Sequence, residues 1–169
     1  MLDLLLQNYR LEISALKMIK LNLLTRAPPL GGTGVTMASI ETTYLGDLRT
    51  EAIHLQSGTK ILTDAPTDNQ GKGEAFSPTD LLAESLAGCI LTTMAMAART
   101  HNINMDGTKA EVTKIMAPNP RRVAEIVVNI KFPTDYSDKE KKILELAAYG
   151  CPVHVSLHPD LKKTIDFGW

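Results

Sequence analysis

The sequence predicts an α+β fold built around one long apolar helix. Segments with the alternating, β-branched pattern of strands gather before and after the helices, whereas a doubly wound sheet would alternate strands with single helices. A run of 14 residues without a charge, residues 85–98, follows the first group of strands. The predicted order is β-β-β-α-β-β-α-α-β, and 44% hydrophobic with 22% charged residues is the composition of a globular protein.

Three strands open the predicted domain. Their segments are rich in β-branched residues and alternate in polarity, and they cover residues 39–45, 48–55 and 59–63. Gln56-Ser-Gly58 predicts a turn between the second and third strands, because glycine accepts the backbone angles of a tight hairpin turn.

The central helix begins at a clear N-terminal signal. Ser77 suits the N-cap, Pro78 suits the first helical position, and Asp80 completes a capping box. We expect the helix to run to about Asn102 and to be apolar on nearly every face. Such a helix is unusual in a domain of this size, so we expect a second subunit to bury the side that the chain's own strands cannot reach.

Two strands, two helices and a final strand complete the predicted domain, at residues 109–116, 123–132, 137–149, a short segment from 152, and 161–167. The first of these helices starts with a second capping box, Ser137 to Glu140, and Gly150 ends it. The short helix starts at Cys151, which suits the N-cap, followed by Pro152 in its first turn.

The chain divides into an appendage and a domain. Residues 1–36 hold a Leu/Ile/Met-rich stretch and a Pro/Gly linker, and residues 37–169 form the predicted domain. The appendage is either an upstream extension without a role or a helix that lies on a partner or a surface.

Composition and charge exclude several classes of protein. The formal net charge is −1 and aromatic residues are 5%, so we expect no nucleic-acid partner. The uncharged run is too short to span a bilayer, no signal peptide opens the chain, and two cysteines are too few for a secreted disulfide scaffold. We therefore expect a cytoplasmic protein with no membrane partner.

The two cysteines, Cys89 and Cys151, are the main candidates for chemistry. Cys89 lies within the apolar helix, where a cysteine often packs as a small hydrophobic residue. Cys151 lies at a helix start, where a thiolate is stabilised. The pair predicts a peroxidatic and resolving couple, and two inert core thiols are the alternative.

Two weaker candidates for a functional role remain at this stage, a set of potential metal ligands and one arginine. Cys151, His154 and His158 have a C-x2-H-x3-H spacing that could hold a metal, although we expect none. Arg49 lies on an early strand, where an arginine usually faces solvent.

Two motifs resemble the osmotically induced / organic hydroperoxide resistance (OsmC/Ohr) family. They are Phe76-Ser-Pro-Thr-Asp-Leu-Leu-Ala-Glu-Ser-Leu-Ala-Gly-Cys89 and Ala148-Tyr-Gly-Cys-Pro-Val-His154, and the resemblance covers residues 37–169. His154 after the Cys-Pro motif is similar to the OsmC-like branch of the family.

The resemblance implies an intertwined homodimer with thiol-based peroxidase activity. Cys89 would be the peroxidatic thiol and Cys151 the resolving one, and Arg49 would stabilise the thiolate and orient the peroxide. The family often has a glutamate where this sequence has Thr79, so Asp80 is the expected substitute partner of Arg49.

The chemistry implied is reduction of an organic hydroperoxide without a cofactor or metal. Cys89 would become a sulfenic acid, Cys151 would condense with it to a disulfide, and an external dithiol reductant would restore both thiols. A non-catalytic dimer of the same fold, which binds a ligand or has a structural role, is the alternative.

Overall fold

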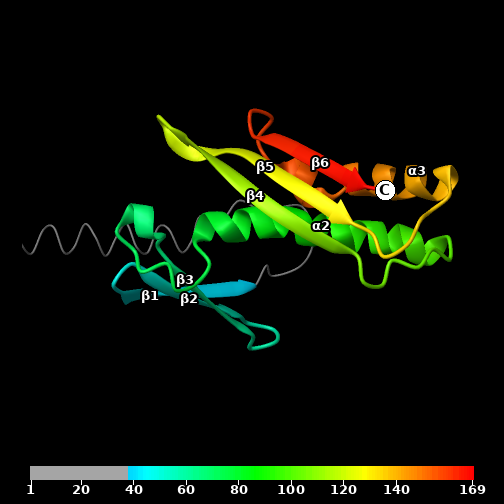
Figure 1. Cartoon of the computed structure of the whole chain (residues 1–169). Coiled ribbons are helices and arrows are strands. Elements are labelled where there is room, and N and C mark those ends of the chain that lie inside the picture. Colours follow the sequence, from blue (N-terminus) through cyan, green and yellow to red (C-terminus); the bar gives the residue numbers. More distant parts are fainter. Residues whose placement is uncertain (1–37) are drawn as a thin grey trace, which may run out of the picture. The chain divides into compact units, whose positions relative to one another are not determined.

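The computed structural model describes residues 38–169, which form two three-stranded sheets and a set of helices; the core lies between the second sheet and the helices (Figure 1). The order of elements is the predicted β-β-β-α-β-β-α-α-β, with one short 3-10 helix, η1 (Thr67–Asn69), in the loop after the third strand. The predicted α+β class is confirmed. The appendage of residues 1–36 lies outside the described residues, and the domain boundary at residue 37 stays a prediction.

The first sheet is an antiparallel meander of β1 (Ile40–Gly46), β2 (Arg49–His54) and β3 (Lys60–Asp64). The register between β2 and β3 places Arg49 directly opposite Asp64. Apolar side chains of this sheet and its turns remain exposed, namely Ile40, Tyr44, Leu45, Leu48, Leu55, Ile61 and Leu62. This sheet therefore lacks an apolar layer against it within the chain.

The helix α2 (Pro78–Thr100) begins as predicted. Ser77 is its N-cap, Asp80 closes the capping box, and Pro78 lies in the first turn. Only one face of α2 is fully buried, through Ala83, Leu86, Ala87, Ile90, Met94 and Ala98. Met96 on another face is 67% exposed, so the chain covers part of this apolar helix and leaves the rest open.

The second sheet packs against the buried face of α2 (Figure 1). Its strands are β4 (Lys109–Pro118), β5 (Arg121–Lys131) and β6 (Lys162–Gly168), and β5 pairs antiparallel with β4 but parallel with β6. The central strand β5 supplies the buried side chains Val123, Ile126, Val128 and Ile130. A register shift opposite Ile115 and Met116 changes the alternation of β5, so that Val123 and Ile126 are both buried.

Two further helices complete the core beside α2. They are α3 (Asp138–Tyr149), which has the predicted second capping box, and the short α4 (Pro152–Ser156). Both pack against α2, and Leu144 and Ala148 of α3 are fully buried. By length and composition alone α2 could cross a membrane, but the core helix of a globular domain passes the same test, and α2 is packed as such a core helix.

An aromatic stack fixes the end of the chain. The ring of Trp169 is parallel to the rings of Phe132, with centroids 4.2 Å apart, and Phe167, with centroids 5.6 Å apart. The ammonium of Lys141 on α3 lies 5.5 Å from the centre of the Trp169 ring. The end of β6 is thereby tied to β5 and α3.

Candidate active site

The structure brings the two predicted cysteines together. Cys89 lies in the middle of α2 and is half-buried, whereas Cys151 is fully buried at the start of α4, which packs against α2. Both thiols are free, and Cys89 packs against the buried cluster that contains Cys151, close enough for each thiol to shift the pKa of the other. The packing of α4 on α2 therefore joins two residues that are 62 positions apart in the sequence.

The position of Cys151 follows from its local sequence. Its Sγ accepts a hydrogen bond from the backbone N–H of His154 at 3.5 Å, so the thiol caps α4 as the sequence predicts. Pro152 occupies the first turn, where a backbone N–H would have no partner. The free N–H groups of this turn thus face the sulfur atoms.

The surroundings of the two thiols shift their pKa values in opposite directions. Burial opposes ionisation of Cys89, but hydrogen bonds from the Cys151 thiol, the backbone N–H of Val153 and the Thr93 hydroxyl lower its pKa overall. Burial raises the pKa of Cys151, and the neighbouring Cys89 raises it further. The geometry therefore favours a thiolate at Cys89 beside a protonated thiol at Cys151.

Arg49 lies in an ionic cluster of its own. On β2, its guanidinium pairs with Asp64 at 3.2 Å and with Glu74 in the loop before α2. The pKa of Arg49 is raised by its hydrogen bonds to Asp64 and Glu74, and the pKa of Asp64 is lowered by the backbone N–H of Glu74 and by Arg49 against the effect of burial. None of the polar contacts of Arg49 within residues 38–169 reaches a cysteine.

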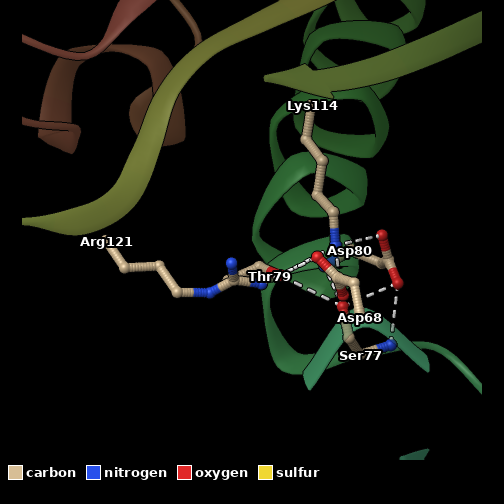
Figure 2. Close-up of polar contacts among 6 residues, drawn as sticks. All are labelled: Asp68, Ser77, Thr79, Asp80, Lys114 and Arg121. Atoms are coloured by element: carbon tan, nitrogen blue, oxygen red, sulfur yellow. Dashed lines mark hydrogen bonds and ion pairs between the residues drawn. The ribbon is translucent and has the colours of Figure 1, made fainter. Parts of the chain in front are cut away.

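The expected pairing of Asp80 with Arg49 is wrong for this structure. Figure 2 shows Asp80 at the start of α2 with the ammonium of Lys114 beside it, and the Nζ of Lys114 is 2.7 Å from Oδ1 of Asp80. The same ammonium donates to the hydroxyls of Ser77 and Thr79, each at 2.8 Å. Thr79, at the position of the family glutamate, thus contacts Lys114 from β4. Arg49 has its own carboxylates, so Asp80 is not available to it.

A second ion pair lies next to this cluster. Arg121, at the start of β5, contacts Asp68 of η1 at 3.1 Å, and Figure 2 shows both near Thr79. A hollow of about 620 Å³ also lies beside the start of α2, with Phe76, Glu84 and Lys114 in its wall. Neither cysteine lines this hollow, so the thiol pair and the ionic clusters are separate features of the chain.

The C-x2-H-x3-H spacing of Cys151, His154 and His158 does not form a metal site in the described part of the chain. Among residues 38–169, no group of three or more His, Cys, Asp or Glu side chains is arranged to hold a metal ion. His158, one of the three residues with the suggestive spacing, is exposed and lies 3.8 Å from Asp160. Cys151 of the same set faces Cys89 instead.

Three contributors to these sites were not identified from the sequence. Lys114 and Asp64 come from strands, and only the tertiary fold places them beside Asp80 and Arg49. Thr93 had a detectable signal, because residues four positions apart face each other on a helix, and Thr93 follows Cys89 by four.

Comparison with protein families identifies the fold. Residues 71–166, more than half of the chain, match the model of the OsmC-like proteins, and this segment contains both cysteines. The chain belongs to the OsmC-like protein family. Among curated proteins, no similar sequence is found.

Solved structures of OsmC-like proteins extend this result. A protein of Psychrobacter arcticus 273-4, named as a candidate osmotic stress induced and detoxification response protein, is 53% identical, with a TM-score of 0.77 over 80% of this chain and 98% of its own. An OsmC-like protein of Mycoplasma pneumoniae is 22% identical, with a TM-score of 0.66 over 79% of this chain and 97% of its own.

A more distant structure carries a name related to redox chemistry. It is the organic hydroperoxide resistance protein OsmC of Legionella pneumophila, also described as a predicted redox protein and regulator of sulfide bond formation. It is 14% identical, with a TM-score of 0.61 over 80% of this chain and all of its own. At such low identity the similarity shows a shared fold only.

Proposed function

We propose that this protein is a thiol-dependent peroxidase that reduces organic hydroperoxides through Cys89 and Cys151. The observation that carries the proposal is the proximity of two free thiols in one core, with pKa values that shift in opposite directions. A peroxidatic thiol must be a thiolate, and a resolving thiol must lie within reach of it. Membership of the OsmC-like family and the hydroperoxide resistance name of a structural neighbour support the same role.

The proposed reaction has three steps: oxidation of Cys89, formation of a disulfide, and reduction of the disulfide. The Cys89 thiolate attacks one oxygen of the hydroperoxide, an S–O bond forms as the O–O bond breaks, and the alkoxide leaves and takes up a proton as the alcohol. Cys151 then attacks the sulfur of the Cys89 sulfenic acid, an S–S bond forms, and water leaves. An external dithiol reduces the disulfide by exchange and is itself oxidised.

The roles of Cys89 and Cys151 follow from their surroundings. Cys89 is the half-buried thiol that a hydroperoxide can approach, and its lowered pKa favours the nucleophilic form. Cys151 is fully buried, so peroxide reaches it poorly, but its contact with Cys89 suits attack on a sulfenic acid. The reaction needs a compartment that keeps thiols reduced, so we also propose a cytoplasmic location.

The second part of the proposal is a homodimer. Exposed apolar residues on β1, on β3 and in the adjoining turns, together with the open face of α2, form an apolar surface that nothing within the described residues covers. A second copy of the chain would cover both. Arg49 lies on the exposed sheet, so we propose that a second copy packed there brings its own active site close to this guanidinium. We propose only a structural role for Asp80, at the start of α2.

Intact mass and thiol counting after one equivalent of cumene hydroperoxide test the redox couple. We expect the wild type to lose two hydrogen atoms and both free thiols within one chain. The Cys151→Ser variant should stop at a Cys89 sulfenic acid that dimedone traps, and the Cys89→Ser variant should not react. If the wild type is unchanged by hydroperoxide, the thiols are inert and the alternative, a ligand-binding or structural dimer, replaces the peroxidase.

Light scattering of the purified chain tests the dimer. We expect twice the mass of one chain for the wild type and a loss of the dimer in Tyr44→Lys, because Tyr44 of β1 is 64% exposed in the isolated chain. Val155→Lys is the matched control, since Val155 is at least as exposed, at 71%, but lies on α4. A wild type that is monomeric at micromolar concentration would contradict this part of the proposal.

A further inference from the structure

Two neighbouring threonines on α2 make the same backbone contact but differ in what else they face. The hydroxyl of Thr92 donates to the carbonyl of Gly88 at 2.8 Å, and the hydroxyl of Thr93 donates to the carbonyl of Cys89 at 2.7 Å. Thr92 is exposed, whereas Thr93 is half-buried and its Oγ1 lies 4.0 Å from the Sγ of Cys89. Only Thr93 therefore lies within reach of the sulfur.

The proton count at Thr93 suits both states of Cys89. A hydroxyl has one proton to donate and lone pairs to accept with. When Cys89 is a thiol, its S–H can point to Oγ1 while the Thr93 proton remains on the carbonyl. When Cys89 is a thiolate, the same proton can turn to the sulfur, because the carbonyl of Cys89 keeps its ordinary helical partner, the backbone N–H of Thr93.

Neutral groups dominate the surroundings of Cys89. Besides burial, the pKa of Cys89 responds to the Cys151 thiol, the backbone N–H of Val153 and the Thr93 hydroxyl, and Cys151 is the only titratable group among them. Within the described residues, α2 packs against α3, α4, β4 and β5, and no charged side chain of these elements forms a hydrogen bond with the sulfur of Cys89. The stability of the Cys89 thiolate therefore depends on a few neutral hydrogen-bond donors, of which Thr93 is one.

We propose that Thr93 is a positioning residue for Cys89, whose hydroxyl accepts the S–H in the thiol state and donates to the sulfur in the thiolate state. In this way Thr93 would set how readily Cys89 reacts. The inference rests on the proposed function of Cys89 as the reactive thiol, and it adds a residue that the family resemblance does not include. No covalent bond forms or breaks at Thr93, since only its hydroxyl rotates.

The test is the pH profile of Cys89 alkylation by iodoacetamide, followed by peptide mass, in the full chain. For Thr93→Val we expect the rate below the pKa to fall about two- to tenfold, the factor given by the loss of one neutral hydrogen bond, with the high-pH plateau unchanged. Thr93→Ser should restore the wild-type profile because it keeps the hydroxyl. Thr92→Val is the matched control and should leave the profile unchanged.

Two outcomes would overturn the inference. Either Thr93→Val has the wild-type profile, or Thr92→Val shifts it equally, which would assign the effect to the helix backbone. If Thr93→Val does not fold, Thr93→Ala measured against Thr93→Ser decides in its place. If Cys89 shows the expected profile but cumene hydroperoxide gives neither a disulfide in the wild type nor a sulfenic acid in Cys151→Ser, the peroxidase proposal is defeated and the role of Thr93 stands.

Discussion

The start of α2 and the middle of α2 hold partly buried ionisable groups in two different ways. At the start, the carboxylate of Asp80 meets a full positive charge, the ammonium of Lys114 at 2.7 Å. In the middle, Cys89 meets a second thiol, a hydroxyl and a backbone N–H. A charged partner fixes one protonation state and adds stability, whereas neutral partners allow the group to change state. The first region therefore suits a structural role, and the second suits the chemistry proposed for Cys89.

The sharpest test of this comparison is selective labelling of the two cysteines. At neutral pH we expect iodoacetamide to modify Cys89 at least about tenfold faster than Cys151, because Cys151 is fully buried and its pKa is raised by burial and by Cys89. The rate at Cys89 should rise with pH through a midpoint below that of an ordinary cysteine. Peptide mass over a time course measures both rates, and equal rates would contradict the assigned roles.

Removing the ammonium at the start of α2 should affect stability and leave the sulfur chemistry unchanged. We expect Lys114→Met to lower the free energy of unfolding by about 1–2 kcal/mol, because Asp80, Ser77 and Thr79 each lose a charged partner. Lys131→Met is the control, since its exposed pair with Glu111 should contribute less than about 0.5 kcal/mol.

Urea unfolding measures both lysine variants, and iodoacetamide labelling checks Cys89 in each. A slower reaction of Cys89 in Lys114→Met would show that the two regions are coupled and would break the comparison.

Acid unfolding gives the smallest expected effect. Burial opposes ionisation of Asp80, but hydrogen bonds from Lys114 and Ser77 lower its pKa overall. Its contribution to stability is therefore present above the ordinary pKa of an aspartate and is lost as the pH falls through the lowered value. Asp80→Asn should be less stable than the wild type at neutral pH by under about 1 kcal/mol, and this difference should shrink in acid.

Urea midpoints between neutral pH and about pH 3 measure the acid effect. Cys89→Ala should keep the wild-type dependence over this range, because a thiol does not titrate there. A constant difference between Asp80→Asn and the wild type at all pH values would contradict the assignment.

Local signals in the sequence predicted most of the fold. The caps at Ser77 and Ser137 and the N-cap role of Cys151 depend on residues within three positions, and the structure has all of them. The order of strands and helices likewise follows from patterns of polarity within short segments of the sequence. The contact between Cys89 and Cys151 was also predicted, although through the family resemblance and the pairing of two scarce residues.

The ionic contacts could not be predicted in the same way. Arg49 meets Asp64 because the β2–β3 register pairs them, and a slip of one residue would turn Asp64 to the opposite face of the sheet. The predicted strands, residues 48–55 and 59–63, differ from the observed ones by one residue at each end, which is enough to leave this register open. Lys114 meets Asp80 across two elements whose packing no local pattern encodes.

The parallel pairing of β5 with β6 has a consequence for how the molecule can be observed. The strand β6 is the last element of the chain, and the single tryptophan of the sequence follows it, stacked on Phe132. Phe132 directly follows β5, so the ring of Trp169 reaches it only when β6 lies beside the central strand. Intrinsic fluorescence therefore reports whether β6 has joined this sheet.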